Sequence, residues 1–183
     1  MTPVPLSDIP FADLDAIVLD LDGTLYNKRG FVSRVILGSL LRLHILVPER
    51  LTRRMFKGRY YGSEEAYLNA FFGGMGKWPT VSAARAHKWY FEEYMPLQEH
   101  ILRCHFHKEQ WIEDILVACR EKGVRVALLS DYDAAREKVV ALGYDPSLFD
   151  YIVSSSQLGG LKPCGESMRK LIEMAGAQPE RSL

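Results

Sequence analysis

The sequence predicts an α/β fold, in which a Rossmann-like parallel sheet carries an inserted α-helical cap domain. Short apolar runs recur at residues 16–21, 124–129 and 151–154, as is typical of buried parallel strands. Helix-like stretches that end at a glycine accompany the later runs. The region between them has helix-length pieces divided by proline and glycine, which indicates a separate helical insertion.

Composition limits the classes of function. With 183 residues and 48% hydrophobic content, the chain is long enough to bury a core. Its 23 basic and 23 acidic residues balance, so we expect neither nucleic acid nor membrane as a partner. Three widely spaced cysteines without a CxxC pair favour reduced thiols, and no N-terminal leader pattern is seen. These features predict a cytoplasmic protein with a small-molecule partner.

The predicted core comprises residues 10–29 and 108–183. Residues 108–122 are amphipathic and stop at Gly123, immediately before the second strand. Residues 134–142 form a second helical stretch, closed by Gly143, so that strand, helix and strand follow as a βαβ unit. A third helix is expected at residues 167–175.

The predicted helical cap is residues 30–107. We expect its helices at 31–46, 49–60, 63–72 and 81–95, with Ser63 as a candidate N-cap and Pro48, Gly62, Pro79 and Pro96 among the breakers. The cap enters after the first strand, above the strand's carboxyl end. Open α/β sheets bind ligands at that edge, so the cap is placed to act as a lid.

The strongest chemical signal is the run Asp20-Leu21-Asp22-Gly23-Thr24. Carboxylates two residues apart in an extended stretch point the same way, and a glycine lets the backbone turn tightly under a ligand. One carboxylate can attack phosphorus while the other protonates the leaving oxygen and later activates water. A divalent cation is needed to offset the repulsion between carboxylates and phosphate, and Mg²⁺ suits such oxygen ligands. We therefore predict Asp20 as the nucleophile and Asp22 as its acid/base partner.

The run AIVLDLDGTLY resembles the first motif of the haloacid dehalogenase superfamily, phosphatase branch. Ser130, which ends VALLS, is similar to the second motif, and Lys162 in GGLKP to the third. The resemblance implies that Lys162 is a catalytic residue that neutralises the nucleophile and the phosphate, and that Asp20 and Asp22 hold the metal. The phosphate-binding residues it suggests are Leu21, Thr24, Ser130, Asp131 and Lys162.

Each of these residues also has an ordinary structural interpretation. Asp-x-Asp-Gly can be a surface turn, Ser130 a strand-end serine and Lys162 a solvated loop lysine. Their order and strand context favour the catalytic set. For other features we prefer the structural interpretation: packing for most aromatic residues of the cap, and a solvated helix face for its basic stripe. That stripe comprises Arg50, Arg53, Arg54, Lys57 and Arg59.

The same resemblance implies a fourth strand beside the first, ending in acidic residues that complete the metal site. Residues 176–183 look like the approach to that strand, so we expect the fourth motif to be missing by C-terminal truncation. The strand's partner would then begin only beyond Leu183, and Mg²⁺ binding would be weak. The open edge of the first strand would be covered by self-association or by a displaced local segment, or the protein would be poorly stable.

The predicted function is a Mg²⁺-dependent phosphatase that hydrolyses a small phosphomonoester through an aspartyl-phosphate intermediate. One alternative is a phosphomutase acting on a sugar phosphate, because it would use the same core. Another is a truncated, non-catalytic binding or assembly module. A dehalogenase is disfavoured, because that branch lacks the second acid that Asp22 supplies. The substrate is not specified by these motifs.

Overall fold

A parallel three-stranded sheet forms the centre of the computed structural model, which describes residues 5–183. The strands β1 (Ala16–Asp20), β2 (Arg125–Ser130) and β3 (Tyr151–Ser154) lie in the order β1-β2-β3. Their register pairs Asp20 with Leu129 and Ser130 with Ser154. The carboxyl ends of all three strands therefore meet at one edge, and the predicted Rossmann-like α/β fold is confirmed.

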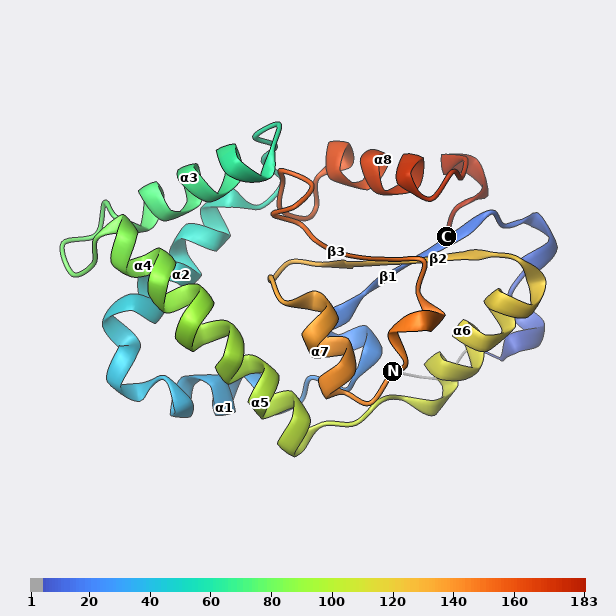
Figure 1. Ribbon diagram of the computed structural model, residues 1–183, viewed down its shortest axis with the longest axis horizontal. Helices are drawn as coiled ribbons and strands as arrows, with labels where there is room; N and C mark the ends of the chain where they lie inside the picture. The colour runs from blue at the N-terminus through green and yellow to red at the C-terminus, as the bar shows by residue number, and fades with distance from the viewer. Residues whose placement is uncertain (1–4) are drawn as a thin grey trace.

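Helices cover both faces of this sheet (Figure 1). On one face lie α6 (Gln110–Lys122) and α7 (Ala135–Ala141), and on the other lies α8 (Gly165–Met174). Alternate residues of β2 point to opposite faces. Thus Val126 joins the larger apolar cluster while Ala127 joins a smaller one beneath α8. This two-sided burial is why β2 is apolar along nearly its whole length.

Five α-helices lie in the chain between β1 and α6, and we call them the helical insertion. They stand to one side of the sheet, on the left in Figure 1. Their bounds are α1 Phe31–Gly38, α2 Leu43–Phe56, α3 Glu64–Met75, α4 Ala83–Trp89 and α5 Met95–His105. Short 3₁₀ or π turns elsewhere are Leu6–Asp8, Phe11–Asp13, Leu21–Leu25, Leu40–Arg42, Tyr90–Tyr94, Pro146–Leu148 and Pro179–Arg181.

Two predicted helix breaks were wrong, and one break was missed. Pro96 is the second residue of α5, and the helical backbone of the Tyr90–Tyr94 turn continues directly into it. Pro48 lies inside α2 and is buried, so packing in the insertion outweighs its usual cost of about 3 kcal/mol. The chain instead breaks at Leu40–Arg42, where a 3₁₀ turn separates α1 from α2. Ser63 does cap α3, its hydroxyl accepting the Ala66 N–H.

In the described part of the chain, one bent pair of helices has the length and composition of a membrane-spanning segment. Within residues 5–183, no single helix is long and apolar enough to cross a membrane. The stretch Phe31–Gly38 and the stretch Leu40–Phe56 pass together on length and composition alone, but they are bent by 69°.

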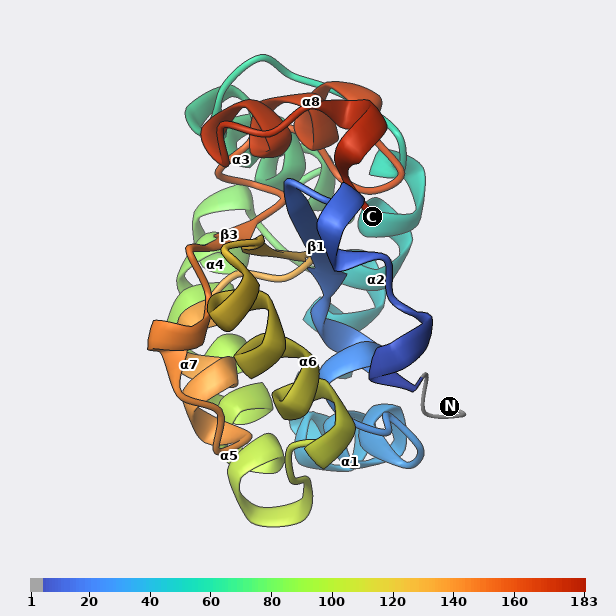
Figure 2. The same ribbon diagram turned by 90° about the vertical axis from the view of Figure 1, so that its right-hand side faces the viewer.

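The last residues of the chain pair with the outer edge of β1. Leu183 donates its N–H to the carbonyl of Ala16 (3.1 Å) and accepts that of Val18 (2.7 Å), while Asp15 donates to Arg181 (2.8 Å). Figure 2 shows the C-terminus beside β1. The sequence prediction placed the strand's partner beyond Leu183 and named a displaced local segment as one way to cover the edge, and the pairing seen here begins at Arg181 and Leu183. This local segment satisfies the outer backbone groups of Ala16 and Val18, the first half of the strand.

Candidate active site

The loop after β1 holds the two aspartates at the strand's carboxyl end. The chain turns at Gly23, whose φ of +98° lies in the left-handed region that favours glycine. Leu21 and Leu25 are buried and anchor the loop to the core. In contrast, the side chain of Asp20 is 46% exposed. The loop therefore presents the Asp20 carboxylate to solvent on a well-packed base.

Lys162 joins the ends of β1 and β2. Its ammonium group donates a hydrogen bond to Oδ1 of Asp20 and another to the carbonyl of Leu129, at 2.7 Å. Leu129 is the residue that the register places opposite Asp20. The positive charge of Lys162 is thus held directly beside the predicted nucleophile.

The side chain of Asp131 fixes the loop that carries Lys162. Its Oδ1 accepts the backbone N–H of Lys162 (3.2 Å) and the hydroxyl of Ser155 (3.0 Å). The sequence suggested Asp131 only as a phosphate-binding residue, so this contact was missed. An acidic residue directly after a strand end was its only signal.

Ser130 lies at the end of β2 but is fully buried. Its hydroxyl oxygen accepts the N–H of Tyr132 at 3.1 Å, rather than contacting Asp20 or Lys162. Thr24 is partly buried in the first loop. The structure therefore brings Asp20, Asp131 and Lys162 into one hydrogen-bonded group and leaves Ser130 beneath the next loop.

Asp22 lies across the turn from Asp20 and has its own partner. The hydroxyl of Tyr26 donates to Oδ1 of Asp22 at 2.7 Å. Burial, reinforced by the neighbouring Asp22 charge, raises the pKa of Tyr26 above its usual value, so the phenol stays protonated. Tyr26 closes the run AIVLDLDGTLY, yet the sequence interpretation assigned it no role. A cavity of about 310 Å³ adjoins it, lined by Gly23, Tyr26, Asn27, Lys28 and Glu109.

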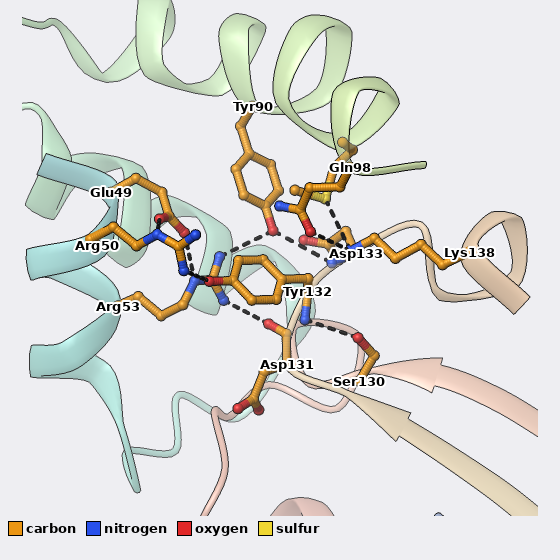
Figure 3. A network of polar contacts seen from close by, with 11 residues as sticks. Glu49, Arg50, Arg53, Tyr90, Gln98, Ser130, Asp131, Tyr132, Asp133 and Lys138 are labelled. Atoms are coloured by element: carbon orange, nitrogen blue, oxygen red, sulfur yellow. Dashed lines mark hydrogen bonds and ion pairs between the residues drawn. The ribbon is translucent and has the colours of Figure 1, made fainter. Parts of the chain in front are cut away.

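A network of polar side chains joins the helical insertion to the loop after β2 (Figure 3). We call it the bridging network. Its members are Glu49, Arg50, Arg53, Tyr90 and Gln98 from the insertion, and Asp131, Tyr132, Asp133 and Lys138 from the core.

Arg53 is the centre of the bridging network. It donates to Glu49 (2.5 Å), to the carbonyl of Asp131 (2.6 Å) and to the hydroxyl of Tyr90 (3.1 Å). Its guanidinium carbon lies 4.0 Å from the centre of the Tyr132 ring. Burial alone would lower the pKa of Arg53, but Glu49 raises it well above its usual value. The group is therefore a permanent cation held between insertion and core.

This position corrects the interpretation of the basic stripe as a solvated helix face. Arg53 is only 7% exposed, and Arg50 donates to the hydroxyl of Tyr132 at 2.6 Å. Arg54, Lys57 and Arg59 are exposed, as expected. Sequence periodicity could not separate these two groups, because the partner residues come from another part of the chain.

Lys138 of α7 extends the network to α5. Its ammonium group is fully buried and donates to Oε1 of Gln98 at 3.0 Å. Burial lowers the pKa of Lys138 to about 8. A buried ammonium group with a neutral hydrogen-bond acceptor is thus part of the contact between core and insertion.

A second contact supports the Lys162 loop through the backbone. Gly58 and Tyr61, between α2 and α3, donate to the carbonyls of Leu161 (2.9 Å) and Gly159 (2.7 Å). A Cβ added at Gly160 would lie 2.9 Å from the carbonyl oxygen of Arg59, so only glycine allows this approach. The insertion therefore braces the segment that precedes Lys162.

Comparison with known proteins identifies the family. A family model described as haloacid dehalogenase-like hydrolase matches residues 14–183. Among the curated proteins, none matches the chain. Similar solved structures include a β-phosphoglucomutase from Clostridium difficile (TM-score 0.59, 16% identity, covering 92% of this chain and 74% of that one).

Two other solved structures are about as similar. A predicted phosphoglycolate phosphatase from Haemophilus somnus 129PT has a TM-score of 0.54 and 16% identity, over 93% of this chain and 75% of that one. An L-2-haloacid dehalogenase from Xanthobacter autotrophicus has a TM-score of 0.54 and 17% identity, over 92% and 68%. At these identities the likeness shows the fold, whereas the family model spans nearly the whole sequence. The chain belongs to the haloacid dehalogenase-like hydrolases.

Proposed function

We propose that this hydrolase is a Mg²⁺-dependent phosphatase that acts on a small phosphorylated metabolite through an aspartyl-phosphate formed on Asp20. The observation that carries the proposal is the contact between the Asp20 carboxylate and the Lys162 ammonium group at the open edge of the sheet. A nucleophile must reach solvent-borne substrate, and Asp20 is half-exposed. A cation beside it offsets the repulsion between carboxylate and phosphate.

In the first step an oxygen of Asp20 bonds to phosphorus, and the bond from phosphorus to the substrate's ester oxygen breaks. Asp22, in its protonated form, gives a proton to that departing oxygen. Lys162 stays beside the phosphoryl group and balances its negative charge. The products of this step are the free alcohol and an acyl phosphate on Asp20.

In the second step Asp22 takes a proton from water while the water oxygen bonds to phosphorus. The bond from phosphorus to Asp20 then breaks, which releases inorganic phosphate and restores both carboxyl groups. Asp22 thus acts as acid and then as base, as microscopic reversibility allows. This double use is why the proposal favours a phosphatase over a dehalogenase.

Carboxylate and carbonyl oxygens are the ligands that Mg²⁺ prefers, so the donor set fits this metal in type. Asp20 would supply a carboxylate oxygen and Asp22 its main-chain carbonyl. Within residues 5–183, no group of three or more His, Cys, Asp or Glu side chains is placed to hold a metal. Substrate and water oxygens would therefore complete the set. When bound, Mg²⁺ would supply charge stabilisation for the transferring phosphoryl group.

Phosphate contacts are proposed at Lys162 and at the loops that begin at Leu21 and Asp131, with Thr24 nearby. Ser130 belongs to this set only if the loop after β2 shifts, because its hydroxyl is buried and faces the Tyr132 N–H. The oxygen of that hydroxyl accepts a bond, so its proton remains available to a phosphate oxygen.

The test is phosphate release from p-nitrophenyl phosphate, with and without Mg²⁺, by the protein and by Asp20→Asn. We expect Mg²⁺-stimulated release that the substitution abolishes. Release without dependence on Asp20 would contradict the proposal. Isomerisation of a sugar phosphate without net phosphate release would indicate a phosphomutase instead.

A further inference from the structure

Tyr26 is placed by the same turn that presents the two aspartates. The reversal at Gly23 returns the chain so that the phenol hydroxyl reaches Asp22, four residues earlier, at 2.7 Å. The side chain of Tyr26 is 1% exposed, whereas Asp22 is only partly buried. The hydrogen bond is therefore anchored on its donor side, while its acceptor keeps access to solvent.

The ring of Tyr26 is held by both connections between core and helical insertion. Phe31 begins α1, and Phe106 directly follows α5. Their rings pack edge-on against Tyr26, with centroids 5.7 and 5.2 Å away, and against each other at 5.8 Å. Such aromatic pairs favour defined angles and distances. The hydroxyl of Tyr26 therefore has little freedom to leave Asp22.

We infer that Tyr26 is a positioning residue for Asp22, which holds one carboxylate oxygen so that the other is directed at the reacting phosphoryl group. The inference rests on the proposed function, because it assigns a role to Asp22 as acid and base. A carboxylate with two equivalent oxygens can rotate, and a fixed bond to Oδ1 removes much of that freedom. Tyr26 is not assigned a proton transfer to substrate, because it is buried and its hydroxyl donates to Asp22.

The test compares Tyr26→Phe with the unsubstituted protein on two substrates of nearly equal shape. p-Nitrophenyl phosphate has a good leaving group that needs little acid assistance, while phenyl phosphate has a poorer one that needs it more. We expect kcat/KM for phenyl phosphate to fall about tenfold, and that for p-nitrophenyl phosphate to fall less than about threefold. Phenylalanine keeps the three-ring packing, so only the hydrogen bond is removed.

Tyr144→Phe is the matched control. The Tyr144 hydroxyl is also buried and donates to the carbonyl of Leu25, in the same loop, at 2.7 Å. Its loss should cost similar stability without changing the ratio of the two substrates' kcat/KM values. Thermal unfolding of both variants checks that they remain folded.

Three results would overturn the inference while leaving the proposed function intact. Equal losses on both substrates in Tyr26→Phe would indicate a merely structural role, as would the same ratio change in Tyr144→Phe. No loss on either substrate would show that Asp22 needs no such partner. If the unsubstituted protein hydrolysed neither aryl phosphate, the proposed function itself would fail and this inference with it, so the two failures are distinct.

Discussion

The first loop and the bridging network lie at the same edge of the sheet, yet their charged side chains differ in exposure to solvent. In the loop, Asp20 has one cationic partner and remains 46% exposed. In the network, the side chain of Glu49 is fully buried and that of Arg53 is 8% exposed. The Arg53 guanidinium group donates hydrogen bonds to three groups of the protein.

This difference in exposure distinguishes a reactive carboxylate from charged groups that join two parts of the protein. A carboxylate that must attack a substrate needs an accessible oxygen, which the loop leaves to Asp20. A buried charge needs an opposite charge beside it, because an unpaired buried charge is costly. Glu49 has Arg53 at 2.5 Å from Oε1 and Arg50 at 3.8 Å from Oε2, although Oε2 accepts no hydrogen bond. The bridging network therefore stabilises the contact between helical insertion and core. The variants below test whether the loop affects activity and the network affects stability.

The largest expected effect is at the loop. Asp20→Asn should lower turnover by at least about a thousandfold, because an amide cannot attack phosphorus. Asp22→Asn should leave slow phosphorylation and accumulate the aspartyl-phosphate. In acid-quenched reactions with a ³²P-labelled phosphoester, the released phosphate measures turnover and the label retained on the protein measures the aspartyl-phosphate. Near-parental activity of Asp20→Asn, in a preparation free of other phosphatases, would remove the nucleophile assignment.

Substitutions in the bridging network should lower the stability of the protein. Arg53→Met leaves the buried Glu49 carboxylate without its closest cation, so the free energy of unfolding should fall by about 3 kcal/mol. Adding Glu49→Gln should recover part of that loss, because the unpaired charge is removed. Urea unfolding measures this. Arg54→Met, on the exposed face of the same helix, is the control and should change stability by less than about 0.5 kcal/mol. Equal losses of unfolding free energy in Arg53→Met and Arg54→Met would contradict the stabilising role of the bridging network.

Lys138 should make the network sensitive to alkaline pH. Its folded pKa of about 8 lies below the ordinary 10.5, so the unfolded chain binds more protons between these values. Stability from this group therefore rises with pH across that window and is lowest below pH 8. The unfolding free energy, relative to that of Lys138→Met, should rise by about 3 kcal/mol between pH 8 and 10.5. A flat difference would show that the buried ammonium is already compensated.

The smallest expected effect concerns the shape of the loop. Gly23→Ala should cost about 1–2 kcal/mol of unfolding free energy, because alanine is strained at positive φ. The new Cβ would also meet Lys28 at 2.9 Å. Gly123→Ala is the control, since its φ is +72° and nothing lies within 4 Å of the added Cβ. Both variants should lose stability, but only Gly23→Ala should lower kcat for p-nitrophenyl phosphate. Equal kcat values would show that the loop tolerates the change.

Local patterns predicted the sheet well and the helical insertion less well. Residues 151–154 were predicted as a strand with the observed bounds, since apolar residues before a turn leave few alternatives. Helix breaks at Pro48 and Pro96 were wrong, because proline's cost depends on position in the helix and on burial. The helix α5 was missed for the same reason.

The sequence by itself determined the chemistry available at the strand ends: two aspartates directly before a glycine, and a later lysine that can neutralise them. Spacing suffices for the aspartates and the glycine, because neighbouring residues of a loop stay neighbours in the fold. The contact of Lys162 with Asp20, 142 residues earlier, depends on the pairing of β1 with β2 and on the loop after β3. Only the tertiary structure decided the partners that lie far apart in sequence. Arg53 contacts the carbonyl of Asp131, and Phe106 packs on Tyr26, because helices of the insertion return to the sheet edge. Those contacts depend on packing between distant segments, which no local periodicity encodes.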